Sequence, residues 1–600
     1  MGSAIGTQQR TTGSGSPPTT RSLLVVDCGS VFTKVALLGM VDGRYRMLAR
    51  SQVPTTIVPP HADVMRGILA GVAEVEHGSA RAIVRDGSII TPERDNGDGV
   101  DGVAVTVSAG GPVHLLMAGP GRDALAALVH RAAGGLFVSL DPLPLDVAPP
   151  SFGGARGDWE RQVAVARAQH PHGVLVVGPS VEGQRGRPDL DETGRIVAAW
   201  IDALRTQPSD VPYGEIAVLF AGSPPDAARL RASLGGHATT VEVGSLAPTT
   251  LAPLSQAIAG LYESSVLRGI PGYEGLRALS RVPLSGTVSS LAGIARYLSQ
   301  HYQLNVVGVD VGANSTMLVG ATAQGGFMPA SHPGAGVGPG AGAVLRAVGA
   351  ANVLRWLPET LDEAELREYV LGRMLRRGML PSSNRELEIE YALAREAIQL
   401  ALRAPGSTLA GMHPVDVLLG SGGTLAHAPS PVRAAMVLLD AVQPRGITSL
   451  ALDVAQLGGM LGGLAAIDPT AAGQIAEGDT VRVQLASVVS TFGSVPEGQP
   501  AVRVILEHGD GQRQTLDVAH GALARLPLHP GERALLSLVP APTVDVGLGA
   551  GQQARASEPL DGSLLGLIVD ARGRPLVLPR TEEARVARIR EWRQALGILS

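Results

Sequence analysis

The stretch LLVVDCGSVFTKVALL, residues 23–38, contains the pattern that decides the fold. Its first half is a short apolar run, typical of a buried strand, that ends at Asp27 and Gly29. A second strand is expected from Val31 to Met40, and the Asp42-Gly43 pair that follows it is a strong hairpin signal. The sequence therefore predicts a strand, an Asp-x-Gly turn, a second strand, a hairpin turn and a returning strand.

The same pattern occurs a second time, in residues 306–326. The apolar run VVGV, residues 306–309, leads into another Asp-x-Gly and another apolar strand. When the two segments are laid over each other without a gap, the matching positions are Asp27 with Asp310, Gly29 with Gly312, Thr33 with Thr316, and Asp42-Gly43 with Gly325-Gly326. A shared D-x-G-x-x-x-T with its hairpin turn in register indicates two related halves.

A third glycine-rich turn follows a predicted strand at residues 415–419. It reads Gly420-Ser421-Gly422-Gly423-Thr424 and precedes a helical segment, residues 432–439. A strand that ends in a glycine-rich turn before a helix is a place where a ligand can lie against backbone amides. On its own this turn is a weak signal.

Together, the three turns indicate a nucleoside triphosphate site. Such a site needs backbone amides around the phosphates, carboxylates that hold Mg²⁺ through water, and small residues beneath the adenosine. The candidate residues are Asp27, Gly29, Ser30, Thr33 and Lys34 in the first turn, Asp310, Gly312, Asn314, Ser315 and Thr316 in the second, and Gly420, Gly422 and Gly423 in the third. In a regular strand Lys34 alternates with Thr33, so one of the two is expected to point away from the nucleotide.

Composition excludes several other mechanisms. The 600 residues carry a net charge of −5 and are 45% hydrophobic, which favours a globular protein of about three or four domains and argues against nucleic acid as a partner. Among 49 basic residues Lys34 is the only lysine, and because Val35 follows it there is no P-loop. Cys28 is the only cysteine, so paired-cysteine zinc sites and internal disulfides are excluded. We interpret Cys28 as a small buried residue and not as a nucleophile.

We expect an α/β chain in five parts. They are a flexible tail (1–22), a first lobe (23–304), a second lobe (305–470), a small β barrel or sandwich (479–580) and a terminal helix (581–600). The tail lacks the apolar run of a signal peptide, and the longest apolar stretch is interrupted by charges that a bilayer would not tolerate, so a cytoplasmic protein is expected.

Periodicity predicts individual elements within these parts. Strands are expected at 173–178, 215–220, 481–489, 502–508, 514–518 and 534–539, and helices at 193–206, 226–234, 361–377, 384–403 and 450–466. The helices at 361–377 and 384–403 carry arginines on faces that we interpret as solvated. Thr581 is expected to cap the last helix.

The three motifs resemble those of a known superfamily. DCGSVFTK, VGVDVGANST and LLGSGGT look like the phosphate-1, phosphate-2 and adenosine motifs of the actin, Hsp70 and sugar-kinase superfamily. Within it the chain most resembles the glutamate mutase L proteins, which are unrelated to the mismatch-repair protein of similar name. This likeness covers roughly residues 23–468 and is also carried by VPTTIVPPHADVMRGI and ELEIEYALAREAIQLAL.

The resemblance implies a two-lobed, duplicated ribonuclease-H-like fold that binds ATP and Mg²⁺. It implies that Asp27 and Asp310 lie at the metal and the phosphates, where they would be the catalytic residues, and that Gly420, Gly422 and Gly423 lie at the adenosine. It further implies a chaperone-like or reactivating ATPase that acts on a protein partner, such as an adenosylcobalamin-dependent mutase, without being a mutase itself.

Two alternatives stay open on the sequence. Met317 and Leu318 follow Thr316 where the superfamily often has an acidic residue, and no residue is identified that would position an attacking water. The chain could therefore be a scaffold that binds ATP without hydrolysing it. A small-molecule kinase on the same fold would need a carboxylate base in the cleft, and no segment indicates one.

Overall fold

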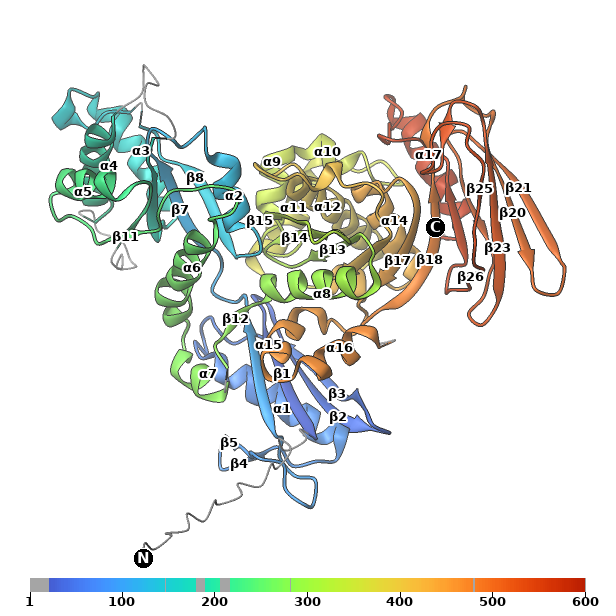
Figure 1. Cartoon of the computed structure of the whole chain (residues 1–600), viewed down its shortest axis with the longest axis horizontal. Helices are drawn as coiled ribbons and strands as arrows, with labels where there is room; N and C mark the ends of the chain where they lie inside the picture. Colours follow the sequence, from blue (N-terminus) through green and yellow to red (C-terminus); the bar gives the residue numbers. More distant parts are fainter. Residues whose placement is uncertain are drawn as a thin grey trace, which may run out of the picture.

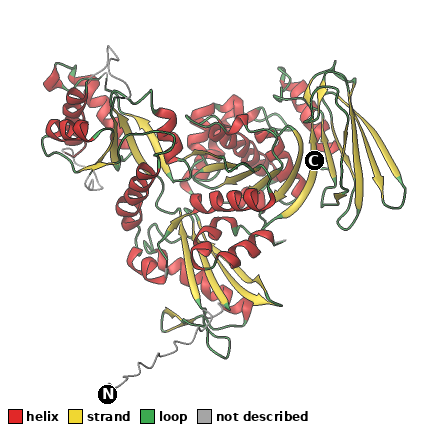
Figure 2. Cartoon of the chain, viewed as in Figure 1, coloured by secondary structure: helices red, strands yellow, loops and turns green. Residues whose placement is uncertain are grey.

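A computed structural model describes residues 21–145, 147–179, 189–205, 216–280, 282–478 and 481–598. Most of the predicted tail (residues 1–20) and the last two residues of the predicted terminal helix lie outside this range. The described chain is α/β, as predicted, with separate sheets that are packed with helices (Figures 1 and 2). No helix in it is long and apolar enough to span a membrane.

The first sheet contains the hairpins predicted from residues 23–53. Its strand order is β12-β6-β1-β2-β3, with β1 antiparallel to β2 and β2 antiparallel to β3. The strands are β1 (Ser22–Cys28), β2 (Phe32–Val41), β3 (Arg44–Pro54), β6 (Gly102–Val107) and β12 (Ser285–Gly286). Both residues of the turn between β2 and β3, Asp42 and Gly43, have positive φ angles, 49° and 75°, as tight hairpins require. The helix α1 (Val64–Ser79) packs on β2 and β3, and a small ribbon, β4 (Val84–Arg85) with β5 (Ser88–Ile89), leads to β6.

A second sheet is inserted between β6 and β12 and is parallel throughout. Its strands are β7 (Val113–Ala118), β8 (Val138–Pro142), β9 (Gly173–Val177), β10 (Ala217–Ala221) and β11 (Thr240–Glu242), in the order β11-β10-β9-β7-β8. This is one of the two common orders of doubly wound α/β folds. Its helices are α2 (Ala126–Ala133), α3 (Arg156–Ala168), α4 (Leu190–Arg205), α5 (Pro224–Leu234) and α6 (Ala252–Leu261). The strands and helices predicted between residues 173 and 234 correspond to β9, α4, β10 and α5.

The chain then returns through α7 (Tyr273–Leu279) and β12 to α8 (Thr287–Tyr302), and enters the third sheet. This sheet has eight strands in the order β15-β14-β13-β16-β17-β18-β27-β22. They are β13 (Val306–Val311), β14 (Thr316–Ala321), β15 (Phe327–His332), β16 (Val417–Ser421), β17 (Gly446–Leu452), β18 (Val483–Ser490), β22 (Leu523–Leu526) and β27 (Leu567–Asp570). Strands β13, β14 and β15 repeat the arrangement of β1, β2 and β3, and β16 lies parallel to β13 as β6 lies parallel to β1.

Helices cover the third sheet and fill the space between it and the first sheet. They are α9 (Ala341–Val348), α10 (Ala350–Leu354), α11 (Glu363–Leu375), α12 (Asn384–Leu402), α13 (Gly423–Ala426), α14 (Pro431–Val442), α15 (Leu461–Ile467) and α16 (Pro469–Glu477). Figure 1 shows α8, α15 and α16 between the first and third sheets. One hydrophobic core includes Leu23 from β1, Leu291 from α8, Val319 from β14 and Leu464 from α15, so these helices join the two sheets.

Two predictions for this region are wrong. The segment 450–466 is not one helix, because residues up to Leu452 form the end of β17 between β16 and β18, and α15 begins only at Leu461. The second error concerns α12, which is buried on nearly all sides: Arg385 near its start is exposed, but Arg395 is not. Its Arg395 is only 4% exposed because Asp440 on α14 pairs with it. Charge pairing between helices is not visible in the periodicity of one helix.

The C-terminal residues form a further β sheet and a helix. The sheet contains β20 (Pro500–His508), β21 (Arg513–Ala519), β23 (Arg533–Pro540), β25 (Ala554–Arg555) and β26 (Leu560–Asp561), and a short ribbon pairs β19 (Phe492–Gly493) with β24 (Val544–Asp545). The strands predicted at 502–508, 514–518 and 534–539 correspond to β20, β21 and β23. The helix α17 (Glu582–Ala595) begins after Thr581, whose side chain makes no capping hydrogen bond.

The predicted boundary near residue 479 falls inside a continuous sheet. Strand β18 pairs antiparallel with β17 of the second predicted lobe and parallel with β27 of the C-terminal part. The C-terminal strands therefore extend the third sheet in addition to forming a sheet of their own.

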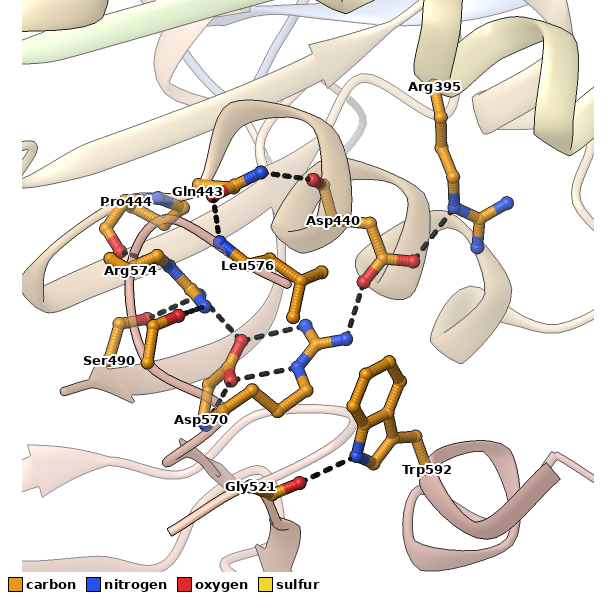
Figure 3. Close-up of polar contacts among 12 residues, drawn as sticks. Arg395, Asp440, Gln443, Pro444, Ser490, Gly521, Asp570, Arg574, Leu576 and Trp592 are labelled. Carbon is orange, nitrogen blue, oxygen red and sulfur yellow. Dashed lines mark hydrogen bonds and ion pairs between the residues drawn. The ribbon is translucent and has the colours of Figure 1, made fainter. Parts of the chain in front are cut away.

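A buried cluster of charged residues links the C-terminal part to α12 and α14 (Figure 3). Asp570 at the end of β27 accepts hydrogen bonds from Arg572 at 2.8 and 2.9 Å and from Arg574 at 2.6 Å. The Arg572 guanidinium also donates to Asp440 at 2.7 Å, and Asp440 accepts a further bond from Arg395 at 2.8 Å. Complete burial by itself would raise the pKa of Asp570. The guanidiniums of Arg572 and Arg574 outweigh that effect and hold the pKa well below its usual range.

Candidate functional site

A cavity of about 610 Å³ lies between the first and third sheets. Its lining includes all three predicted turns, which the chain places at the ends of β1, β13 and β16. The predicted site residues that line it are Asp27, Gly29, Ser30, Lys34, Asp310, Gly312, Asn314, Ser315, Gly422 and Gly423. Residues far apart in the sequence are therefore brought together at one cleft.

The two Asp-x-Gly turns have the same local geometry. The Gly29 amide donates to the Phe32 carbonyl at 3.1 Å, and the Gly312 amide donates to the Ser315 carbonyl at 2.9 Å. A Cβ atom at either glycine would lie only 2.7 or 2.9 Å from that same carbonyl oxygen. The pairing registers also agree, with Asp27 opposite Lys34 and Asp310 opposite Met317. Glycine is required at both turns because a side chain would displace the carbonyl that closes them.

Asp27 is held in place by three side chains. Its Oδ1 accepts hydrogen bonds from Thr287 at 2.8 Å and from Thr106 at 3.2 Å. Its Oδ2 lies 3.1 Å from Lys34 Nζ, and the lysine side chain is 18% exposed toward the cavity. The carboxylate is thus oriented from β6 and α8, and Asp27 and Lys34 line the cavity together.

Asp310 differs from Asp27 because no side chain in the described residues donates a hydrogen bond to it. Burial raises the pKa of its carboxyl, the nearby Asp27 raises that pKa further, and Lys34 opposes both effects. Two carboxylates that face one cavity, one without a partner, are suited to a divalent cation that keeps several waters. The residues present therefore fit a Mg²⁺ ion bound together with phosphates.

The third turn rests against the end of β13. Gly422 has a φ of 94°, and a Cβ there would lie 2.2 Å from the Val311 carbonyl oxygen and 2.8 Å from Asp310 Oδ1. A Cβ at Gly423 would meet nothing within 4 Å, so this residue leaves the cavity wall open. Ser421 donates to the buried Asp453 at 3.1 Å, which ties the turn to the chain beyond β17. Burial raises the pKa of Asp453 to about 6.

The far wall of the cavity contains polar residues that the sequence analysis missed. Glu390 on α12 accepts hydrogen bonds from Thr424 at 2.7 Å and from Arg373 Nη2 on α11 at 2.9 Å. Burial raises the pKa of Glu390, and Arg373 opposes that effect. Arg373 lines the cavity, and its Nη1 atom is buried with no hydrogen-bond partner among the described residues. The sequence predicts a solvated arginine face on α11, which holds for Arg367 but is wrong for Arg373, and helical spacing alone gives no signal that separates the two.

Three predicted residues do not line the cavity: Thr33, Thr316 and Gly420. Lys34 and Met317 face the cavity, so the threonines that precede them in each strand face the opposite side of the sheet. Thr33 Oγ1 lies 2.9 Å from Thr55 Oγ1, and Thr316 Oγ1 has no hydrogen-bond partner in the described part of the chain. A Cβ at Gly420 would meet the side chains of core leucines. Of the two neighbouring residues Thr33 and Lys34, it is therefore Lys34 whose side chain lies at the cavity.

Cys28 lies on the core side of the same turn. It is completely buried, and burial raises the pKa of its thiol to about 12. The side chain is therefore a neutral thiol near pH 7 and no nucleophile, which agrees with our interpretation of the sequence.

Replacing Lys34 with methionine, the residue at the equivalent position 317, is expected to weaken Mg-ATP binding by about tenfold or more. The change removes the ammonium that faces the cavity and leaves two carboxylates without a cation beside them. Isothermal titration calorimetry measures the effect, with Lys34→Arg as the control that keeps the charge. Unchanged affinity together with a lower melting temperature would instead assign Lys34 to anchoring the hairpin.

Comparisons with solved structures give low similarity. Component A of (R)-2-hydroxyglutaryl-CoA dehydratase from Acidaminococcus fermentans is 11% identical in sequence. The match covers 76% of this chain and 98% of that protein's chain, with a TM-score of 0.24. A diol dehydratase-reactivating factor in nucleotide-free form is 12% identical over 74% of this chain and 99% of its own, with a TM-score of 0.28. Xylulose kinase from Bifidobacterium adolescentis is 11% identical in sequence over 77% of this chain and 94% of its own length, with a TM-score of 0.25. At these TM-scores the likenesses carry no argument for the fold or the function of this chain.

Sequence comparison is more informative. No curated protein matches the chain. A family model described as MutL protein matches residues 23–137 and 210–480, which together make up more than half of the chain and include all three turns. The family model does not match residues 138–209, which include β8, α3, β9 and α4 of the inserted sheet and its helices. The matched segments agree with the resemblance seen in the motifs, and the chain belongs to the MutL protein family, that of glutamate mutase L.

Proposed function

We propose that this protein binds ATP with Mg²⁺ in the cavity between the first and third sheets and acts as a chaperone-like or reactivating ATPase on a partner enzyme. The observation that carries the proposal is the convergence of both Asp-x-Gly turns and the Gly-Ser-Gly-Gly turn on one cavity with two carboxylates and an ammonium. The repeated hairpins support a two-lobed, duplicated fold of the actin and Hsp70 type. Family membership supports a partner such as an adenosylcobalamin-dependent mutase.

Each part of the cavity has a role in this proposal. The backbone amides of the two Asp-x-Gly turns would face the phosphates, with Ser30, Asn314 and Ser315 as further donors. Asp27 and Asp310 would hold Mg²⁺ through water, and Lys34 would balance their charge. When bound, ATP supplies a phosphoanhydride whose hydrolysis can drive a change in the protein.

The wall made by Gly422, Gly423, Arg373 and Glu390 would hold the nucleoside. Arg373 Nη1 is buried without a partner, and an unpaired buried donor of this kind costs free energy until an acceptor reaches it. A purine or ribose acceptor would satisfy it. Closing the two sheets on the nucleotide would also shift α8 and α15, which pack between them, and so change the surface offered to a partner.

Thermal unfolding with and without nucleotide tests the proposal. Mg-ATP at about one hundred times its dissociation constant is expected to stabilise the folded chain by roughly 2.7 kcal/mol, because the ligand binds the folded state alone. Absence of any shift with Mg-ATP or Mg-ADP would overturn the nucleotide site. Phosphate release with and without a candidate mutase then separates an ATPase from an ATP-binding scaffold, and a panel of sugars and short acids detects a kinase.

A further inference from the structure

A second cavity, of about 630 Å³, lies between the inserted sheet and the third sheet. Strand β8 of the inserted sheet and strand β15 of the third sheet line it along their lengths, with Val138 to Asp141 on one side and Gly326 to Pro333 on the other. Figure 1 shows these two strands near each other where the inserted domain meets the central sheet. The cavity is separate from the candidate nucleotide site.

The cavity faces the edges of these strands and not their flat faces. Successive side chains of a strand point to opposite faces of the sheet, so a cavity on one face would be lined by every second residue. Here consecutive residues of both strands line it. Strand β8 ends the order of its sheet and β15 ends the order of the other, and within the described residues no strand pairs with either outer edge.

The hydrogen-bond pattern identifies the unpaired backbone groups of β15. The Thr322 amide donates to the Gly326 carbonyl at 2.9 Å, which makes this the first paired position of the hairpin. Paired and unpaired positions alternate along an antiparallel edge, so Phe327, Pro329 and Ser331 direct their backbone groups away from β14 and toward the cavity. Proline at this outward position agrees with the rule that it occurs on strand edges.

The same reasoning applies to β8. The Phe137 carbonyl and the Leu143 amide bond to β7, at 2.9 and 2.8 Å, so the outward positions between them are Val138, Leu140 and Pro142. Both edges thus offer backbone carbonyls toward one space. Pro329 and Pro142 have no N–H, and the Val138 amide already donates to the Leu136 carbonyl at 3.2 Å, so the outward donors are the amides of Leu140, Phe327 and Ser331. An extended chain is the ligand whose own backbone complements such edges.

Side chains around the cavity define the chemistry of that ligand further. Phe327, Met328 and Leu140 provide apolar surface. Arg131 is exposed at the cavity and forms no ion pair among the described residues, whereas the Asp141 carboxylate already accepts a hydrogen bond from Ser139 at 2.9 Å. An acidic residue on the ligand would therefore find a free cation at the α2 end of the cavity.

We propose that this cavity, the β8–β15 groove, binds an extended segment of a partner protein by strand addition. The segment is about four to six residues long, since six residues of β15 span roughly 20 Å. It carries apolar residues at alternate positions and an acidic residue that reaches Arg131. The inference deepens the proposed function, on which it rests for the existence of a protein partner.

Selection from a displayed library of short linear peptides against the full chain, without nucleotide, tests the groove. Selected peptides are expected to be extended, with alternating apolar residues and an aspartate or glutamate. Hydrogen exchange should show new protection at the amides of Leu140, Phe327 and Ser331. Arg131→Glu is expected to weaken binding about tenfold or more, whereas Arg195→Glu, at an exposed position of α4 in the same inserted domain, should not.

A chemical block provides a second, independent readout. Cys28 is buried with a pKa of about 12, so in a Ser331→Cys variant a bulky maleimide labels residue 331, which lines the groove, and leaves Cys28 unmodified. Labelling should abolish peptide binding, whereas labelling Ser557→Cys, exposed in the C-terminal part, should not. The proposal is overturned if no peptide is selected, if protection appears elsewhere, or if binding survives the block. The thermal shift with Mg-ATP is measured separately from peptide binding. A groove that binds no peptide can therefore be distinguished from a cavity that binds no nucleotide.

Discussion

Replacing Asp570 with alanine is expected to lower the free energy of unfolding by about 3–5 kcal/mol. The carboxylate is completely buried and lies within hydrogen-bond distance of both Arg572 and Arg574 (Figure 3). Its removal leaves Arg574 with no carboxylate partner among the described residues, and leaves Arg572 with Asp440 alone, which also pairs with Arg395. Chemical denaturation followed by tryptophan fluorescence measures the loss, because Trp592 stacks 4.8 Å from the Arg572 guanidinium.

The same carboxylate makes stability depend on pH in a defined direction. Its folded-state pKa lies below its ordinary value of 3.8, so its stabilising contribution is present above about pH 4 and is lost as the pH falls toward the folded pKa. Asp517→Ala is the matched control, since Asp517 forms a bidentate pair with Arg503 on the exposed face of β20 and β21. That variant is expected to have nearly unchanged stability. Equal effects of the two substitutions would contradict the structural role of the buried cluster.

Replacing Asp27 or Asp310 with alanine is expected to abolish the thermal shift produced by Mg-ATP. Each change removes one of the two aspartates that line the cavity, and Asp27→Ala also leaves Lys34 without its partner at 3.1 Å. A loss of about 2.7 kcal/mol of ligand stabilisation corresponds to binding at least one hundredfold weaker. Differential scanning fluorimetry across a nucleotide titration measures it.

Thr316→Val is the control for these two variants. The sequence pattern assigns Thr316 to the phosphate site, but its hydroxyl is buried on the other side of β14 and has no partner. Valine has the same shape, so the variant should keep the full Mg-ATP shift and be as stable as the parent or slightly more so. If Thr316→Val removes the shift while Asp310→Ala retains it, the nucleotide does not bind at this cavity.

Local patterns account for the parts of the site that lie in turns. Asp42-Gly43 and the two Asp-x-Gly turns could be predicted because a tight turn restricts φ angles and side-chain volume within a few residues. The strands of the C-terminal sheet could be predicted for a related reason, because alternation along β21 and β23 reflects burial of one face. These features need no information from distant residues.

Other parts of the site depend on which segments meet. The strand pattern predicts that Thr33 and Lys34 point to opposite faces of the sheet. Which of the two faces the cavity is decided by the third sheet, which packs across it and places Lys34 in the lining. Arg373 and Glu390 form part of the wall because Arg373 on α11 pairs with Glu390 on α12, and Glu390 also accepts a hydrogen bond from Thr424 in the turn after β16. A helix that is polar in sequence can be buried when its charges are paired by another helix, and periodicity does not record that pairing.

The sequence by itself therefore determined the α/β class, the repeated hairpins, the three glycine-rich turns and the two aspartates. These features depend on short-range sterics and on the period of apolar residues, and both are set by residues that are close together in the sequence. The tertiary structure alone decided the side of the strand that faces the cavity, the far wall, the continuation of the third sheet through β18, and the two open edges at the β8–β15 groove. Those depend on contacts between residues separated by tens to hundreds of positions, which local propensity does not encode.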